Sequence, residues 1–269
     1  MNNHDYLKIT EKQNLRSHLI QEQLSRKNID EVIKFHQSTT WIPTPNINNL
    51  RNSYSNKNWL NTIEKLEPSP NFVQRTIKLN NIELDTKVKD TIIEYSKDFT
   101  MTLDTLGKIL IESFGNGIGK RYDTIGDIYL SVPILLLFED DAVNGLSAGS
   151  YYFDDKELNL LQIKNWDSQK INKQILELQN NDIPSFTAIA YSIDIQKAAS
   201  IYGKRGYRNA LIEIGSMKQS FREAINIVEP NLIESCWSNF PDNFISHLCG
   251  TNIRLAPILL IQWFGKRRI

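Results

Sequence analysis

The sequence predicts an α+β fold built around a mixed sheet. Two stretches, 103–114 and 207–227, place apolar residues at helical spacing. Between them lie a short all-apolar run, 132–141, and a strand–turn–strand pattern over 149–163. Because strands and helices alternate unevenly and one hairpin is present, the order differs from that of a doubly wound parallel sheet.

The composition excludes several classes of protein. The chain has 269 residues, 41% of them hydrophobic, and equal numbers of basic and acidic residues, whereas nucleic-acid-binding proteins usually have a basic surplus. It has no apolar run of the about 20 residues that span a bilayer, and its polar N-terminus does not resemble a signal peptide. Cys236 and Cys249 are too few for a disulfide framework or a zinc cluster. We therefore expect a cytoplasmic protein that binds no metal, no nucleic acid and no membrane.

The first 85 residues are predicted to form an N-terminal helical and extended arm. Residues 6–35 have apolar residues at broadly helical spacing. Residues 42–80 are rich in proline and asparagine, and so long a stretch without a clear element is unusual inside a compact domain. We expect the arm to wrap a surface, such as that of a second subunit, and residues 86–269 to form the main domain.

The remaining elements follow in order within that domain. The helix over 103–114 ends at Gly115, which fits a helix C-cap. The run 132–141 has the length of a buried central strand. Residues 185–193 are predicted to form a further strand, and residues 254–265 the closing strand.

Common catalytic motifs are missing from the sequence. The segment GNGIG lacks the spacing and the helix-opening position of a dinucleotide fingerprint, so it is predicted to be a helix end followed by a loop. There is no G-x-S-x-G motif, and the four histidines show no metal-binding spacing. No pair of acids stands out, so an ordinary hydrolase is not supported.

The last long helix has three cations at its start: Lys204, Arg205 and Arg208. Because the free N–H groups of a helix start carry partial positive charge, cations at this place predict a negative partner. The partner is either a nearby acid, such as Asp194 or Glu213, or an anionic ligand.

Gly215 lies inside this helix, where glycine costs about 1 kcal/mol relative to alanine. The position predicts a close approach, either by a second helix or by a flat ligand. The predicted apolar stripe of the helix consists of Ala210, Leu211, Ile214, Met217, Phe221, Ala224, Ile225 and Val228.

Two further basic groups stand at the ends of predicted elements: Lys120 with Arg121, and the run from Lys266 to Arg268. Three cationic loops in a neutral protein predict a shared anionic cofactor. Flavin mononucleotide (FMN) would supply both a phosphate and a flat ring.

Five motifs occur in an order that resembles the SagB-type dehydrogenases of the nitroreductase-like superfamily, over nearly the whole chain. They are IKFHQSTTW, LDTLGKILIESFG with KRYDTIGDIYLSVPILLL, GLSAGSYYFDDKELNLLQI, YGKRGYRNALIEIGSMKQSF and NFPDNFISHLCGTNIRLAPILLIQWFG. The fourth is the most specific, since it is similar to the family's Tyr-Gly-x-Arg-Gly-Tyr-Arg-x-Ala-Leu-x-Glu-Ala-Gly-His.

The resemblance implies a nitroreductase-like fold with a mostly antiparallel sheet, and an FMN-dependent homodimer with the flavin at the subunit interface. Residues 86–269 would be the FMN-binding domain. Such dehydrogenases oxidise thiazolines or oxazolines in a precursor peptide to thiazoles or oxazoles. They work beside the cyclodehydratase subunits of a heterocycle synthetase complex.

The resemblance also implies residue roles. The residues expected around the flavin are Arg121, Thr124, Gly126, Arg205, Tyr207, Arg208 and Gly215. Lys266 and Arg267 are candidates for the phosphate because of their charge and position. Tyr202 is the expected acid or base; many relatives carry a lysine just before it, and Lys204 is a candidate to replace that lysine.

Two alternatives remain open. The chain has Ile201 where many relatives have lysine, Ser216 where they have histidine, and Ile125 where their turn has a glycine. These departures favour a non-catalytic scaffold or peptide-binding subunit of the same complex. The third possibility is a flavin oxidoreductase for small molecules such as nitro compounds.

Overall fold

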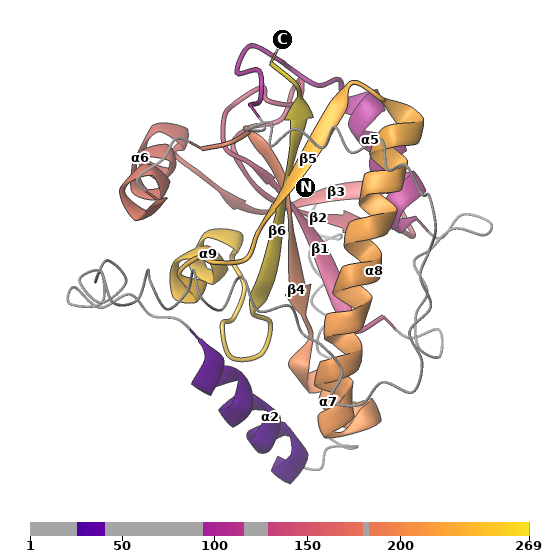
Figure 1. Cartoon of the computed structure of the whole chain (residues 1–269), viewed down its shortest axis with the longest axis vertical. Coiled ribbons are helices and arrows are strands. Elements are labelled where there is room, and N and C mark those ends of the chain that lie inside the picture. The colour runs from indigo at the N-terminus through magenta and orange to yellow at the C-terminus, as the bar shows by residue number, and fades with distance from the viewer. Residues whose placement is uncertain (1–25, 41–93, 116–128, 180–182, 269) are drawn as a thin grey trace, which may run out of the picture. The chain divides into compact units, whose positions relative to one another are not determined.

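The computed structural model describes residues 26–40, 94–115, 129–179 and 183–268 (Figure 1). The chain divides into two compact units, residues 1–41 with 93–269, and residues 42–92. All described residues belong to the first unit. The predicted boundary at residue 85 stays a prediction, and the expected extended arm over 42–80 lies outside the described residues.

Six strands form one sheet in the order β3-β2-β1-β4-β6-β5, and every neighbouring pair is antiparallel. The strands are β1 (Ser131–Leu137), β2 (Gly149–Asp154), β3 (Asn159–Asn165), β4 (Thr187–Ile193), β5 (Leu232–Trp237) and β6 (Ile258–Lys266). The predicted central strand, hairpin, further strand and closing strand are β1, β2 with β3, β4 and β6. The mostly antiparallel character is confirmed, and these six strands contain no parallel pair, so the sheet is more uniform than the mixed sheet expected.

The central strands β1 and β4 are apolar on both faces because helices cover both. Successive side chains of a strand point to opposite faces. Leu135 and Leu137 of β1 therefore pack with one set of helices, and Ile134 and Leu136 pack with the other. This two-sided burial explains why the run has no polar alternation.

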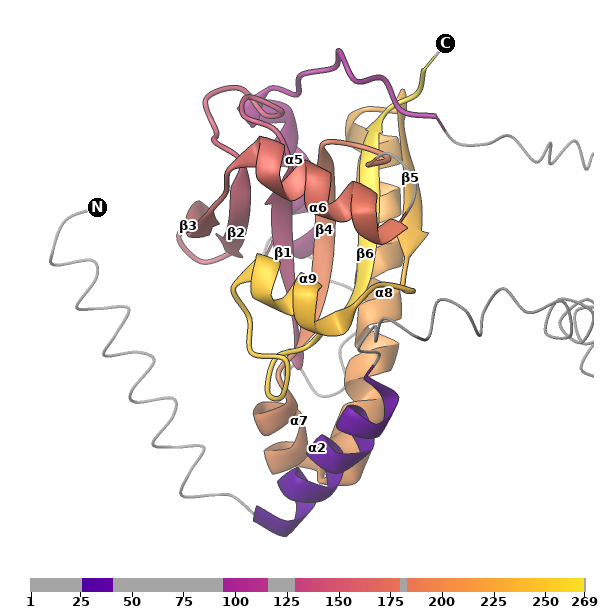
Figure 2. The ribbon, with the colours of Figure 1, turned by 90° about the vertical axis from the view of Figure 1, so that its left-hand side faces the viewer.

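Helices α5 and α8 lie on one face of the sheet, and α6 and α9 lie on the other (Figures 1 and 2). The helices are α2 (Arg26–Thr39), α5 (Leu103–Phe114), α6 (Ser168–Gln179), α7 (Ile195–Tyr202), α8 (Lys204–Val228) and α9 (Asp242–Cys249). Phe114 of α5 stacks on Phe221 of α8, with ring centroids 5.8 Å apart. Helix α2 packs against α7 and α8. None of the described helices is long and apolar enough to cross a membrane.

The long helix predicted over 207–227 is confirmed as α8, which begins three residues earlier. Most of its predicted apolar stripe is buried, but Leu211 is 44% exposed. Gly115 ends α5 as predicted, and its N–H donates to the carbonyl of Ile111. The elements β5, α6 and α7 were not predicted from the sequence.

Candidate functional site: the joint between α7 and α8 and the pocket beside it

Two glycines shape the joint between α7 and α8. Gly203 stands between the helices with a φ of +58°, a conformation that side chains rarely adopt. Gly206 lies in the first turn of α8, where a Cβ atom would stand 1.9 Å from the carbonyl oxygen of Ala198. The glycines of the YGKRGY motif therefore allow the chain to turn back and the two helices to pack closely.

The fold itself supplies a negative partner for one cation at this joint, Lys204. The carboxylate of Glu31, on α2, forms an ion pair with Lys204. The hydrogen bond from Lys204 is the main cause that lowers the pKa of Glu31. The last turn of α7 also ends here, and helix C-terminal ends carry partial negative charge. The acid that the structure pairs with Lys204 thus comes from α2, and Arg205 and Arg208 are exposed.

Tyr207 hydrogen-bonds to a buried histidine 171 residues away in the sequence. Its hydroxyl lies 3.1 Å from Nδ1 of His36, on α2. Burial lowers the pKa of His36 and raises the pKa of Tyr207. The backbone of Ile253 and the charge of Asp242 oppose the shift of His36 without cancelling it. Both groups are therefore neutral near pH 7.

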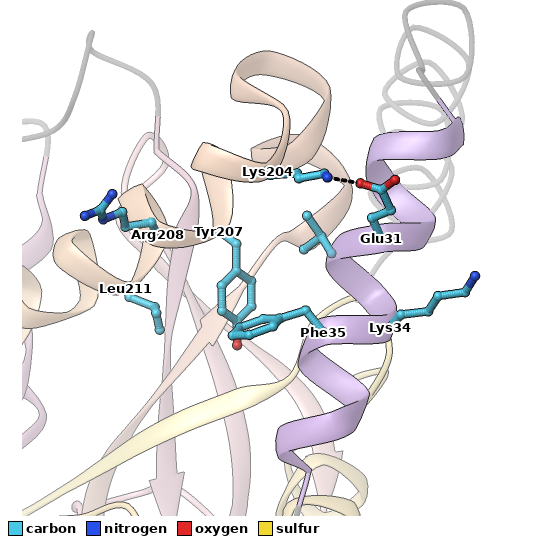
Figure 3. A pocket seen from close by; sticks show the side chains of 8 residues that line it. Glu31, Lys34, Phe35, Lys204, Tyr207, Arg208 and Leu211 are labelled. Carbon is cyan, nitrogen blue, oxygen red and sulfur yellow. Dashed lines mark ion pairs between the residues drawn. The ribbon is translucent and has the colours of Figure 1, made fainter.

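An open pocket of about 640 Å³ lies between α2 and α8, and we call it the α2–α8 pocket. Its apolar wall includes Phe35 and Tyr207, whose rings meet edge to face with centroids 5.8 Å apart (Figure 3). The residues that line it are Glu31, Val32, Lys34, Phe35, Lys204, Tyr207, Arg208 and Leu211. The pocket thus brings together three predicted site residues, Lys204, Tyr207 and Arg208, with side chains of α2.

Tyr202, the predicted acid or base, is the last residue of α7. It is half-buried, packs against the apolar core, and is not among the described residues that line the α2–α8 pocket. Its catalytic role stays a prediction.

Gly215 lies on a face of α8 that no other described element approaches closely. A Cβ atom at this position would meet no atom within 4 Å, so the described residues provide no helix contact that requires a glycine here. The sequence offered two explanations for this glycine, a second helix or a flat ligand. A second helix among the described residues of the same protomer is therefore wrong. A ligand or a second subunit remains as the predicted neighbour.

Lys266 and Arg267 line a second pocket of about 410 Å³, which we call the strand-end pocket. Residues just before α5 hold this end of β6: the N–H of Ser96 donates to the carbonyl of Lys266, at 2.8 Å. Arg268 pairs with Glu94, at 3.6 Å. The basic strand end is thus fixed beside an open pocket.

The two pockets lie at opposite ends of α8. The α2–α8 pocket is at its first turns, while Pro230 and Asn231 of the strand-end pocket follow its last residue. A helix of 25 residues is about 37 Å long. Among the described residues of one protomer, Lys266 and Arg267 therefore do not lie beside Tyr207 and Arg208.

The loop with Arg121, Thr124 and Gly126 lies outside the described residues. The chain that leaves it is held by Glu213 of α8, whose two carboxylate oxygens accept the N–H of Leu130, at 3.1 and 2.9 Å. Glu213 is buried, so its position at the end of this loop is fixed.

Sequence reasoning missed Glu31, Phe35 and His36, and it named Glu213 only as a possible partner of the cations. The first three lie on α2, and no local pattern links them to α8. The signal that could have found Phe35 and His36 is the segment IKFHQSTTW, and Glu213 stands in the signature of the fourth motif. No group of three or more potential metal ligands occurs in the described part of the chain, where no metal was expected.

Comparisons with known proteins give the same fold. No family model matches the chain. The microcin B17-processing protein McbC of Escherichia coli is 24% identical over 174 residues, which are 61% of this chain and 62% of that protein. The alignment therefore spans less than two thirds of this relative.

Solved structures extend the likeness. One chain of the Escherichia coli microcin synthetase McbBCD complex, solved with truncated pro-MccB17 bound, superposes with a TM-score of 0.74 and 19% identity, covering 93% of this chain and 97% of that chain. A protein of Anabaena variabilis assigned as a nitroreductase gives a TM-score of 0.54 and 22% identity, over 65% of this chain and 36% of that one. The nitroreductase-like fold is confirmed, and the microcin proteins support the resemblance to the SagB-type dehydrogenases.

Proposed function

We propose that this chain is an FMN-dependent dehydrogenase that oxidises thiazolines or oxazolines to thiazoles or oxazoles in a ribosomally made precursor peptide. We further propose that it acts beside cyclodehydratase subunits in a heterocycle synthetase complex. The observation that carries this proposal is the superposition on a chain of the McbBCD complex over nearly the full length of both chains. The five ordered motifs and the sequence likeness to McbC point the same way.

The strand-end pocket fits the phosphate of FMN. It is open, and Lys266 and Arg267 on its wall are exposed cations. A phosphate bound there would gain charge-assisted hydrogen bonds. When bound, a flavin accepts the hydride of the ring being oxidised.

In this proposal, the part of the site that holds the flavin ring is completed by a second copy of the chain. Two copies packed with their α8 helices antiparallel would bring the first turns of one α8 to the strand-end pocket of the other. Gly215 lies near the middle of α8, so it would stand at the crossing point, where a small residue lets two helices approach closely. The exposed residue Ile212, which does not line the α2–α8 pocket, would be covered by the same contact.

The catalytic residues would then act from α7 and the start of α8. We assign to the Tyr202 hydroxyl oxygen the transfer of the proton that leaves the ring carbon. Lys204 would place a positive charge beside it, held in position by Glu31. Aromatisation of the product makes the step hard to reverse.

The absorption spectrum of the purified protein tests the cofactor. We expect a flavin spectrum, and expect the double variant Lys266→Ala with Arg267→Ala to lose it, because the phosphate would lose both cations. Arg254→Ala, at an exposed cation outside both pockets, is the matched control. A colourless wild-type protein that FMN cannot reconstitute would refute the cofactor.

Turnover of an azoline-containing peptide tests the reaction. Tyr202→Phe should keep the flavin spectrum and lose turnover, and an unchanged rate would remove Tyr202 from the mechanism.

Self-association tests the subunit arrangement. Gly215→Ala should weaken self-association in sedimentation experiments. Gly107→Ala on α5, where a Cβ atom also meets nothing within 4 Å, is its control.

A non-catalytic subunit is the second candidate. Ile201 precedes Tyr202 where many relatives have lysine, and its side chain is exposed rather than part of the core, so packing does not explain the change. Fully oxidised product from a complex that lacks this chain would favour this candidate over the dehydrogenase.

A further inference from the structure

Large apolar side chains stand exposed along the α2–α8 pocket. Phe35 is 58% exposed and Leu211 is 44% exposed, and both line the same pocket. They come from helices far apart in the sequence, so their proximity results from the fold. An apolar group that entered the pocket would remove both from water, which is favourable in proportion to the area covered.

Contacts hold the apolar wall of the pocket in place. The Tyr207 hydroxyl is hydrogen-bonded with Nδ1 of His36. Phe35 packs edge to face on the Tyr207 ring (Figure 3). Because burial lowers the pKa of His36 and raises that of Tyr207, the pair carries no charge near neutral pH. The apolar wall therefore presents ring carbon, not a charge or a free hydroxyl.

The charged side chains at the rim of the pocket indicate what charge its partner carries. Lys204 and Glu31 pair with each other, which leaves Lys34 and Arg208 without an ion pair inside the described ranges. These two cations extend on opposite sides of the aromatic pair (Figure 3). The rim thus has a surplus of positive charge, which favours a partner that carries a negative group.

We propose that the α2–α8 pocket binds a segment of the peptide substrate in which a bulky apolar side chain stands next to a carboxylate. The apolar side chain packs on Phe35, Tyr207 and Leu211, and the carboxylate pairs with Arg208. This inference rests on the proposed function only in taking a peptide as the substrate. It gives the enzyme a preference for sequence beside the ring that it oxidises.

Binding of short capped peptides to the full-length protein tests the proposal by calorimetry, without any turnover. The probe is acetyl-Gly-Gly-Phe-Glu-Gly-Gly-amide. Replacing its Phe by Ala should weaken binding about tenfold or more, because the apolar side chain is lost. Replacing its Glu by Gln should weaken binding about twofold to fivefold, the range expected for an exposed ion pair.

Variants of the protein assign these preferences to residues. Phe35→Ala should remove the preference for Phe over Ala, and Arg208→Gln should remove the preference for Glu over Gln. Leu103→Ala and Arg254→Gln are matched controls, since both residues are exposed and neither lines the pocket. Both controls should keep the wild-type pattern.

Three results would overturn the proposal: no binding of the probe up to millimolar concentration, equal binding of all three peptides, or preferences that survive both pocket variants. Displacement of the probe by NADP+ at lower concentration than by peptide would identify a phosphate ligand instead. Failure of the proposed function gives a different result. A protein without flavin that still selects the Phe-Glu peptide refutes only the dehydrogenase, whereas a yellow protein without this selection refutes only the pocket assignment.

Discussion

Gly206→Ala should destabilise the protein strongly, because Gly206 is the point of closest approach between α7 and α8. The added Cβ atom would stand 1.9 Å from the carbonyl oxygen of Ala198 and 2.4 Å from its carbonyl carbon. Real contacts of Cβ atoms essentially never fall below 3.0 Å, so the two helices must separate by at least about 1.1 Å. The obstacle is backbone, which cannot rotate away as a flexible side chain can.

The cost follows from this displacement. Overpacking of a closely packed interior costs typically about 1–3 kcal/mol, and a clash with backbone belongs at the upper end of that range. Alanine recovers only about 1 kcal/mol of helix propensity. We therefore expect a net loss of about 2 kcal/mol, which lowers the melting temperature by roughly 4–8 °C in a protein of this size.

The assay is thermal unfolding followed by far-ultraviolet circular dichroism, with Gly107→Ala as the matched control. Gly107 is also inside a helix, but its Cβ atom would meet no described atom within 4 Å. The control should gain up to about 1 kcal/mol and melt roughly 2–4 °C higher than the wild type. If Gly206→Ala also melts higher, α7 and α8 do not pack as described and the reasoning fails.

Three further changes test other contacts by urea unfolding. Because burial lowers the pKa of His36 below its ordinary 6.5, the unfolded chain binds more protons in acid, so the unfolding free energy should fall from about pH 7.5 to about pH 5.5. His36→Asn should flatten that fall, and an unchanged slope would contradict it. Glu213→Ala should lower the unfolding free energy by about 1–3 kcal/mol, because the buried N–H of Leu130 loses its acceptor. Glu213→Gln keeps one acceptor oxygen, so its loss of stability should be smaller. Equal losses for the two variants would refute the hydrogen bond. Glu31→Gln should leave the unfolding free energy nearly unchanged, since the Lys204 side chain is 67% exposed, and a clear loss would show that the pair contributes more than an exposed ion pair does.

Much of the sheet could be predicted from the sequence because its central strands are unusually apolar. β1 and β4 are buried on both faces and stand out as apolar runs between turns. The edge strand β5 has no such signal, since LIESCW mixes polar and apolar residues, and its pairing with β6 gives it its strand structure. Local pattern therefore predicts the centre of the sheet better than its edge.

The site was less predictable because its contacts are long-range. The partner of Lys204 is Glu31, not one of the nearby acids, and the partner of His36 is Tyr207. No spacing rule links residues that meet only after α2 packs on α8. What local sequence does show is the pair of glycines at the joint, whose separate roles become clear from the backbone angle of Gly203 and the clash at Gly206.

The contact between His36 and Tyr207 also sets an order of events during synthesis. The ribosome must add 171 residues after His36 before Tyr207 exists, which takes roughly 10–35 s at typical elongation rates. For most of that interval Ile29, Val32 and Ile33 of α2 have no α7 or α8 on which to pack. The α2–α8 pocket is therefore among the last parts of the protein to form, and a chain that stops short of α8 has no such pocket.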